Sequence, residues 1–280
     1  MKKFNDLIRR EEFWENLWHE IVENTVVLKT QWSNPERWKQ FYDTVGPMFA
    51  DLWGDSERLG MEIAGLLYRE GIIGEEDRVL DVGCGSGWLS LGLARFSSSV
   101  TALDYSSKMV QHLSNMVIKR GINNIYVVNE DFLNFSPEEP FDVVIAAFFP
   151  QAVSPEGILK LEHLARKRCV FLLQYSKSNI SIQQKLFEHI VGQPPLSPGL
   201  SLLLWCFGYL ITRGRFPEIR KWHWESKINM AFEEMLSFYK AYFAVFGFDE
   251  NAVMEAFKRV NISSTSFVLS CNLAVLWWEK

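Results

Sequence analysis

The segment Val79–Trp88, with the sequence VLDVGCGSGW, decides the fold. Its first four residues form a short, mostly apolar run that is typical of a buried strand, and the glycines after it predict a sharp turn. A helix from Trp88 to Arg95 follows the turn. Glycine lets a backbone approach a ligand closely, and open α/β sheets bind ligands just outside such strand ends. The segment therefore predicts a site for a nucleotide-like cofactor.

Strand and helix patterns keep alternating after this turn. Further strands are predicted at Val100–Leu103, Ile125–Val128, Phe141–Ile145 and Cys169–Leu173, with helices from Ser107 to Arg120 and near Pro155 to Lys167. These strands are almost continuously apolar, which is typical of parallel strands covered on both faces. The pattern predicts a doubly wound, mostly parallel sheet.

The regions on either side of this core are rich in aromatic residues. Five of the eleven tryptophans lie in the first 53 residues, five lie after residue 204, and only Trp88 lies between. On the N-terminal side we expect an amphipathic helix from Phe4 to Val22, a helix capped at Ser33 and interrupted at Gly46–Pro47, and a helix from Asp55–Ser56 to Gly71.

The C-terminal side is less regular. We expect an extended loop at Gln193–Gly199, a buried helix at Leu200–Ile211, a strand near Ile219–Trp224, helices near Ala231–Phe246 and Glu250–Arg259, and a final strand at Phe267–Trp278. Three parts follow: an N-terminal helical lid over 1–73, a cofactor-binding α/β core over 74–175, and the C-terminal half of the sheet with a helical substrate-pocket insertion over 176–280.

The net charge, the cysteine spacing and the length of the apolar runs disfavour some classes of partner and location. The net charge of -5 gives no attraction to phosphate, so nucleic acid is disfavoured as a partner. The four cysteines are far apart in sequence and form no zinc or disulfide pattern. No apolar run reaches the roughly 20 residues of a membrane span, and the N-terminus lacks a signal peptide, so we expect a cytoplasmic protein. The first helix could pack on its own domain or on a second copy in a homodimer.

The spacing of the glycines separates two kinds of cofactor. Glycines stand at positions 83, 85 and 87, and Trp88 occupies the place of the third glycine in the dinucleotide pattern G-x-G-x-x-G. An indole there would obstruct the close strand–helix packing that the third glycine allows. A nicotinamide oxidoreductase is therefore a less favoured reading.

Asp81–Gly87 resembles the first motif of class I S-adenosylmethionine-dependent methyltransferases, of the small-molecule type and similar in layout to enzymes of quinone and metallophore biosynthesis. The resemblance implies that the glycine turn lies beneath the methionine part of the cofactor, and that Asp81 supports its amino group. Asp104 would bind the ribose hydroxyls, Asp131 the adenine amino group, and Phe132 the ring. The strand Phe141–Ile145 would end at the cofactor and the substrate.

The expected fold class is therefore α/β, a doubly wound, mostly parallel seven-stranded Rossmann-like sheet with an N-terminal helical layer and a C-terminal helical insertion. The cofactor is expected to be S-adenosylmethionine, with S-adenosylhomocysteine as its product. Its expected binding residues are Tyr42, Asp81, Gly83, Cys84, Gly85, Ser86, Gly87, Asp104, Tyr105, Met109, Asp131, Phe132 and Ala147.

Several features favour a small-molecule acceptor. Methyl transfer needs positioning and exclusion of water, which predicts a cover over the cofactor, and residues 34–53 with Trp38, Tyr42 and Trp53 are the candidates. Methyltransferases of exocyclic base amines carry Asp/Asn-Pro-Pro-Tyr/Phe where this chain has Ala146–Pro150, so that class is not indicated. We expect no metal and assign no general base, although His189 and His223 lie in the C-terminal part. A domain that binds the cofactor without catalysis is the alternative.

Overall fold

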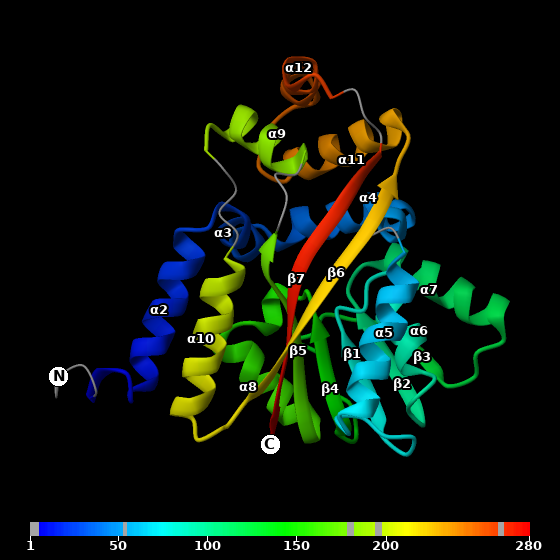
Figure 1. Ribbon diagram of the computed structural model, residues 1–280, viewed down its shortest axis with the longest axis vertical. Helices are drawn as coiled ribbons and strands as arrows, with labels where there is room; N and C mark the ends of the chain where they lie inside the picture. The colour runs from blue at the N-terminus through cyan, green and yellow to red at the C-terminus, as the bar shows by residue number, and fades with distance from the viewer. Residues whose placement is uncertain (1–5, 53–54, 178–181, 194–197, 263–265) are drawn as a thin grey trace.

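A single seven-stranded sheet forms the centre of the computed structural model, which describes residues 6–52, 55–177, 182–193, 198–262 and 266–280 (Figure 1). The strand order is β3-β2-β1-β4-β5-β7-β6. The strands are β1 (Arg78–Val82), β2 (Ser99–Asp104), β3 (Ile125–Asn129), β4 (Phe141–Ala147), β5 (Ala165–Lys177), β6 (Glu218–Asn229) and β7 (Ser266–Glu279). Strands β1 to β5 are parallel, whereas β7 runs antiparallel to both β5 and β6. The expected fold class is confirmed.

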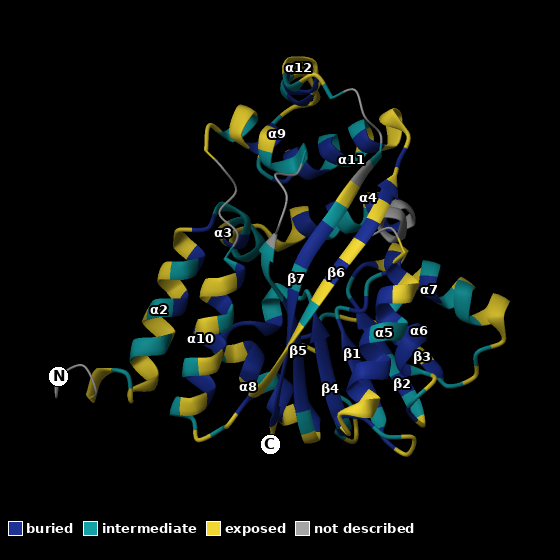
Figure 2. Cartoon of the chain, in the orientation of Figure 1, coloured by how far each residue is buried: buried dark blue, intermediate teal, exposed yellow. Residues whose placement is uncertain are grey.

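Helices cover both faces of the sheet. Helices α2 (Glu11–Glu23), α8 (Pro155–Leu164) and α10 (Gly199–Thr212) share one core cluster with the sheet. Helices α5 (Ser56–Arg69), α6 (Trp88–Leu93) and α7 (Ser107–Arg120) share a second core cluster with the sheet. Figure 2 shows the central strands as the most completely buried part of the chain. This double covering explains why the parallel strands have almost no polar positions.

A third core lies beyond the ends of the strands. Helices α4 (Pro35–Leu52), α9 (Ile182–Val191), α11 (Phe232–Ala244) and α12 (Glu250–Val260) pack there around a largely aromatic cluster. The long antiparallel strands β6 and β7 extend from the sheet to this layer, at the top of Figure 1. We call the four helices the cap. The short helix α3 (Val26–Ser33) joins α2 to α4.

The caps of two helices, α5 and α7, are the ones that the sequence predicts. Asp55 caps α5 by accepting from the backbone N–H of Arg58, and Ser106 caps α7 by accepting from that of Met109. Gly121 ends α7 in the left-handed conformation, with φ of 63°. Ser106 at one end and Gly121 at the other thus define where α7 begins and ends.

One helix prediction was wrong. Gly46–Pro47 does not interrupt the second helix, because α4 continues to Leu52. A proline inside a helix costs about 3 kcal/mol. Packing of α4 on α7 opposes this cost: a Cβ on Gly46 would lie 3.3 Å from the Cβ of Lys108, so the helices are in close contact there.

Other differences concern elements that the pattern did not show. Helices α3 and α9, and the 3₁₀ turn η1 (Pro150–Ala152), were not predicted. The first amphipathic helix was expected from Phe4, which lies outside the described residues. A turn at residues 8–9 interrupts this helix, and α2 begins at Glu11. Ser33 ends α3 instead of capping α4. Most of the expected loop at Gln193–Gly199 lies outside the described residues. Among the described helices, none is long and apolar enough to cross a membrane.

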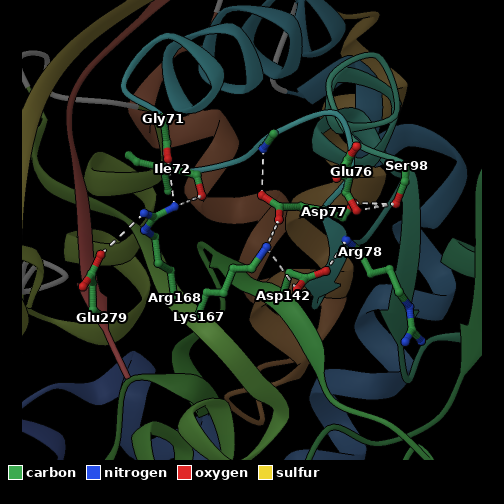
Figure 3. A network of polar contacts seen from close by, with 11 residues as sticks. Gly71, Ile72, Glu76, Asp77, Arg78, Ser98, Asp142, Lys167, Arg168 and Glu279 are labelled. Atoms are coloured by element: carbon green, nitrogen blue, oxygen red, sulfur yellow. Dashed lines mark hydrogen bonds and ion pairs between the residues drawn. The ribbon is translucent and has the colours of Figure 1, made fainter.

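A polar network ties the strands together at the edge of the sheet opposite the glycine turn (Figure 3). The ammonium of Lys167 lies 2.6 Å from Asp77 Oδ1 and 3.2 Å from Asp142 Oδ1. Asp142 Oδ2 also accepts from the backbone N–H of Arg78 at 2.9 Å. Although burial raises the pKa of Asp142, these hydrogen bonds and charges lower it overall. The carboxylates are satisfied within the fold, so the network is structural.

Candidate active site

The glycine turn after β1 has a backbone that only glycine adopts readily. Gly83 has φ of 68° and Gly85 has φ of 53°, both in the left-handed region. The backbone N–H groups of Gly83 and Cys84 both donate to the carbonyl of Leu103 in β2, at 2.8 and 3.0 Å. A Cβ on Gly83 would lie 2.5 Å from the ring of Phe149, whereas one on Gly85 would meet no atom within 4 Å. The turn is therefore fixed on one side and open at Gly85.

Asp104 at the end of β2 holds this turn in place. Its Oδ2 accepts from the backbone N–H of Gly85 at 2.9 Å, and its Oδ1 accepts from that of Ser106 at 2.8 Å. Burial raises the pKa of Asp104 to about 6, although hydrogen bonds from the backbone N–H groups of Ser106, Gly85 and Tyr105 stabilise the ionised form. A carboxylate has about four lone-pair sites, so Asp104 can still accept from a ligand.

Asp81 lies behind the turn and is almost fully buried. Its Oδ2 accepts from Ser90 Oγ, and its Oδ1 has no hydrogen-bond partner among the described residues. Burial raises the pKa of Asp81 to about 7, against the hydrogen bond from Ser90. Asp81 therefore supports the base of the turn and is not part of the pocket wall.

A pocket opens in front of the turn. Nine of the thirteen predicted cofactor-binding residues line it: Tyr42, Gly83, Cys84, Gly85, Ser86, Asp104, Tyr105, Met109 and Ala147. Their sequence positions span more than a hundred residues, and the strand order 3-2-1-4 brings them together because the carboxyl ends of adjacent parallel strands share one edge.

The other four predicted residues lie outside this lining. Asp81 is behind the turn, and Gly87 caps α6, where a Cβ would lie 2.2 Å from Leu113. Asp131 Oδ1 accepts from the backbone N–H of Leu133 at 2.9 Å, and Phe132 is buried with its ring centroid 5.7 Å from that of Phe149. The binding roles of these four stay predictions.

Comparison with known proteins identifies the domain that carries this pocket. Residues 79–167 match the methyltransferase domain family. They form a class I S-adenosylmethionine-dependent methyltransferase domain. The matched segment contains the glycine turn, Asp104 and the end of β4, and the cofactor of this domain family is S-adenosylmethionine.

Relatives of this methyltransferase domain act on different acceptors. The zebrafish EEF1A lysine methyltransferase 2 is 32% identical over 121 residues, which are 42% of this chain and 51% of the relative. An rRNA adenine N-6-methyltransferase of Bacteroides fragilis is 36% identical over 77 residues, 27% of this chain and 28% of the relative. The chain thus spans about half of the first relative's length and about a quarter of the second's.

A solved structure shares the fold of the methyltransferase domain beyond the matched residues. The YcgJ protein from Bacillus subtilis has a TM-score of 0.51 and 13% identity, with 78% of this chain and 97% of that chain covered. At this level of identity the likeness concerns the fold alone.

The methyltransferase domain is covered by residues from the N-terminal helices. Tyr42 and Trp38 of α4 line the pocket, as the lid prediction expects, while Trp53 lies outside the described residues. Gln31, Trp32 and Pro35, at the junction of α3 and α4, also line it. Gln31 and Trp32 were missed because the sequence pattern did not indicate α3, whereas Pro35 lies within the predicted lid segment 34–53.

A hydrogen-bond path joins this cover to the cofactor turn. Asp43 of α4 accepts from Ser106 Oγ at 2.7 Å and from the backbone N–H of Lys108 at 3.3 Å. Ser106 in turn donates its N–H to Asp104, which holds Gly85. The cover is therefore anchored to the N-terminus of α7, next to the carboxylate that faces the pocket.

The end of β4 forms the wall opposite Asp104. Phe148 has φ of 52°, which is rare for an aromatic residue, and its N–H donates to the carbonyl of Leu172 at 3.0 Å. The chain then turns through η1, so that Phe148, Phe149, Pro150 and Gln151 all line the pocket. Strained backbone is common at functional sites. No sequence signal indicates a left-handed Phe148.

Apart from the carboxylate of Asp104, no side chain that could serve as a general base is found among the described lining residues. His189, His223, Glu225 and Tyr175 are all absent from the described lining. His223 is exposed, and its Nδ1 lies 3.0 Å from Asn272 Oδ1 on β7. Burial raises the pKa of Cys84 well above its usual value, and it raises those of Tyr42 and Tyr105 as well. None of these three groups can accept a proton at neutral pH.

Proposed function

We propose that the protein is an S-adenosylmethionine-dependent methyltransferase with a small-molecule acceptor. The observation that carries the proposal is the pocket itself: a glycine turn and Asp104 on one side, and an aromatic cover from α3 and α4 on the other. When bound, the cofactor supplies an electrophilic methyl group on a sulfonium. The residues of the chain then need to orient the acceptor and exclude water.

The pocket has room and hydrogen-bonding capacity for this cofactor. The space in front of Gly85 is open, so backbone and ligand can come close there. Asp104 keeps lone-pair capacity for a hydroxyl donor, and a ribose offers two adjacent hydroxyls. The strand order puts Ala147 and Phe148, at the end of β4, on the other side of the turn from Asp104. We assign the acceptor to that side.

The cover supports a small acceptor. Helices α3 and α4 contribute Gln31, Trp32, Pro35, Trp38 and Tyr42 directly to the wall, and α4 is held from behind by the aromatic core of the cap. In this proposal residues 1–73 act as the lid, 74–175 bind the cofactor, and 176–280 complete the sheet and carry a helical insertion, although no described residue of this part lines the pocket.

A macromolecular acceptor fits the pocket less well. The two relatives above are named for a lysine and an adenine acceptor. In this chain, no Lys, Arg or His is found among the described lining residues, and the net charge is -5. Nucleic-acid recognition depends on such cations. The end of β4, Ala146–Pro150, also has no Asp or Asn to hold an exocyclic base amine.

A labelling experiment tests both parts of the proposal. The protein is incubated with S-adenosylmethionine carrying a radioactive methyl group and with a cell extract, which is then separated into small molecules, protein and RNA. We expect S-adenosylhomocysteine release and label in the small-molecule fraction. At a cofactor concentration below the Kd, Asp104→Asn should reduce both about tenfold or more. Label on protein or RNA would contradict the small acceptor, and cofactor binding without any label would indicate a binding domain.

A further inference from the structure

The acceptor side of the pocket has an unusual balance of charge. Among the described lining residues, Asp104 is the one side chain that is charged at neutral pH, and no Lys, Arg or His is present. The uncharged polar side chains toward β4 and the lid are Gln31 and Gln151. A ligand in this pocket therefore meets no positive side chain.

This balance disfavours an anionic acceptor. A phenolate, thiolate or enolate would have to leave water for walls with a carboxylate and no cationic side chain, so the sulfonium of the bound cofactor would be its one positive partner, and burying a poorly paired charge is costly. Apart from Asp104, which lies on the cofactor side, the described lining also has no base that could remove a proton from a neutral hydroxyl or thiol. An acceptor that reacts here must carry its lone pair without first losing a proton in the pocket.

The walls favour a cation instead. Seven aromatic side chains line the pocket, from α3, α4, the β1–α6 and β2–α7 regions and the end of β4: Trp32, Trp38, Tyr42, Trp88, Tyr105, Phe148 and Phe149. Aromatic faces attract cations, and indole does so most strongly. Gln31 Oε1 is also buried without a hydrogen-bond partner among the described residues, so an ammonium N–H would satisfy it.

We propose that the acceptor atom is the nitrogen of an uncharged amine on an apolar body, held between the indoles of the lid and the aromatic end of β4. The nitrogen lone pair forms the new bond to the methyl carbon, while the bond from that carbon to sulfur breaks and its electron pair stays on sulfur. The cofactor becomes a neutral thioether and the amine becomes an ammonium. One positive charge is present in the pocket before and after transfer, and any N–H proton leaves in solvent after release.

Three probes of similar shape test this inference, which rests on the proposed function. They are (3-hydroxyphenyl)trimethylammonium, which resembles a methylated product, its neutral isostere 3-tert-butylphenol, and the anion 3-hydroxybenzoate. Calorimetry on protein saturated with S-adenosylhomocysteine should show the cation binding about tenfold more tightly than either of the others. Equal or tighter binding of the neutral or anionic probe, or no binding of the cation, would overturn the inference.

Matched variants assign the preference to the lid. Trp32→Leu should reduce the preference for the cation about threefold or more while leaving S-adenosylhomocysteine affinity within about twofold. Trp222→Leu, a partly buried indole on β6 outside the pocket, should change neither. Phe149→Leu repeats the test from the β4 side in case Trp32→Leu fails to fold. An unaltered preference in both folded pocket variants would contradict the aromatic site.

The outcome is separable from that of the proposed function. Failure of S-adenosylhomocysteine to bind would contradict the methyltransferase proposal itself. Tight binding of S-adenosylhomocysteine without any preference for the cation would leave that proposal intact and overturn the amine acceptor alone.

Discussion

Asp104 Oδ2 accepts a hydrogen bond from the backbone N–H of Gly85 at 2.9 Å, so the carboxylate that ends β2 also fixes the glycine turn that follows β1. The two parts of the expected cofactor site are therefore not independent. A change at Asp104 should affect both the ribose contact and the shape of the turn.

Asp104→Asn keeps the size of the side chain and removes its charge. An amide has one oxygen that can accept, so it cannot hold Gly85, Ser106 and two ribose hydroxyls together. We expect S-adenosylhomocysteine affinity to fall at least about tenfold, which is about 1.4 kcal/mol, as measured by calorimetry. Asp249→Asn, at the N-cap of α12, is the control and should bind normally. Unchanged affinity in a folded Asp104→Asn variant would count against the assignment.

The raised pKa of Asp104 predicts a pH dependence of binding. With a pKa of about 6, the carboxyl of the free protein is ionised at pH 7.5 and largely protonated at pH 5. A protonated carboxyl accepts hydrogen bonds less well, so the Kd for S-adenosylhomocysteine should rise as pH falls below 6. Well below the pKa, the rise should be at most about tenfold for each pH unit. Asp104→Asn should flatten the profile. A wild-type Kd that stays constant between pH 5 and 7.5 would exclude this mechanism.

Gly85 and Gly121 form a matched pair of glycines. Both have positive φ, 53° and 63°, and a Cβ on either would meet no atom within 4 Å. Alanine at either position should destabilise the fold by about 1 kcal/mol, because the left-handed conformation is unfavourable for it. Only Gly85→Ala places a methyl group in the pocket, so only this variant should also lose cofactor affinity. Equal cofactor binding by the two variants would place the ligand elsewhere.

The substitutions Asp81→Asn and Asp142→Asn should change the pH dependence of the free energy of unfolding in opposite directions. The folded pKa of Asp81 is raised to about 7, so its contribution to stability is fully present below the unfolded pKa and is lost as pH rises to 7. Asp81→Asn removes this loss. We take the free energy of unfolding of Asp81→Asn minus that of the wild type. This difference should be larger at pH 8 than at pH 5 by at least about 1 kcal/mol.

The folded pKa of Asp142 is lowered, so its contribution is present above the unfolded pKa and is lost as pH falls through the folded value. Asp142→Asn should therefore be less stable than the wild type at pH 8, and the difference should narrow in acid. Urea unfolding at several pH values measures both variants. The same sign for the two would contradict the opposite environments of these carboxyls.

The core of the site could be predicted from sequence because its signals are local. A buried strand, glycines and an acidic residue at the next strand end indicate Gly83, Gly85 and Asp104 without knowledge of the rest of the chain. Parallel pairing then brings them to one edge. The continuation of α4 through Pro47 could not be predicted, since it depends on tertiary packing against α7.

The acceptor side could not be predicted for a different reason. Gln31 and Trp32 reach the pocket through the angle between α3 and α4, and Phe149 to Gln151 reach it through the left-handed backbone of Phe148. Neither depends on a periodic pattern or a turn residue. Such walls follow from packing between elements that are distant in sequence, which one sequence alone does not reveal.

The central claim is that the turn at Gly85 and the carboxylate of Asp104 hold S-adenosylmethionine. A crystal structure with S-adenosylhomocysteine tests it most directly. We predict both ribose hydroxyls within hydrogen-bond distance of Asp104, with the sulfur directed toward Phe148 and the lid. A nucleoside bound elsewhere, or a pocket that stays empty at saturating S-adenosylhomocysteine, would contradict the claim.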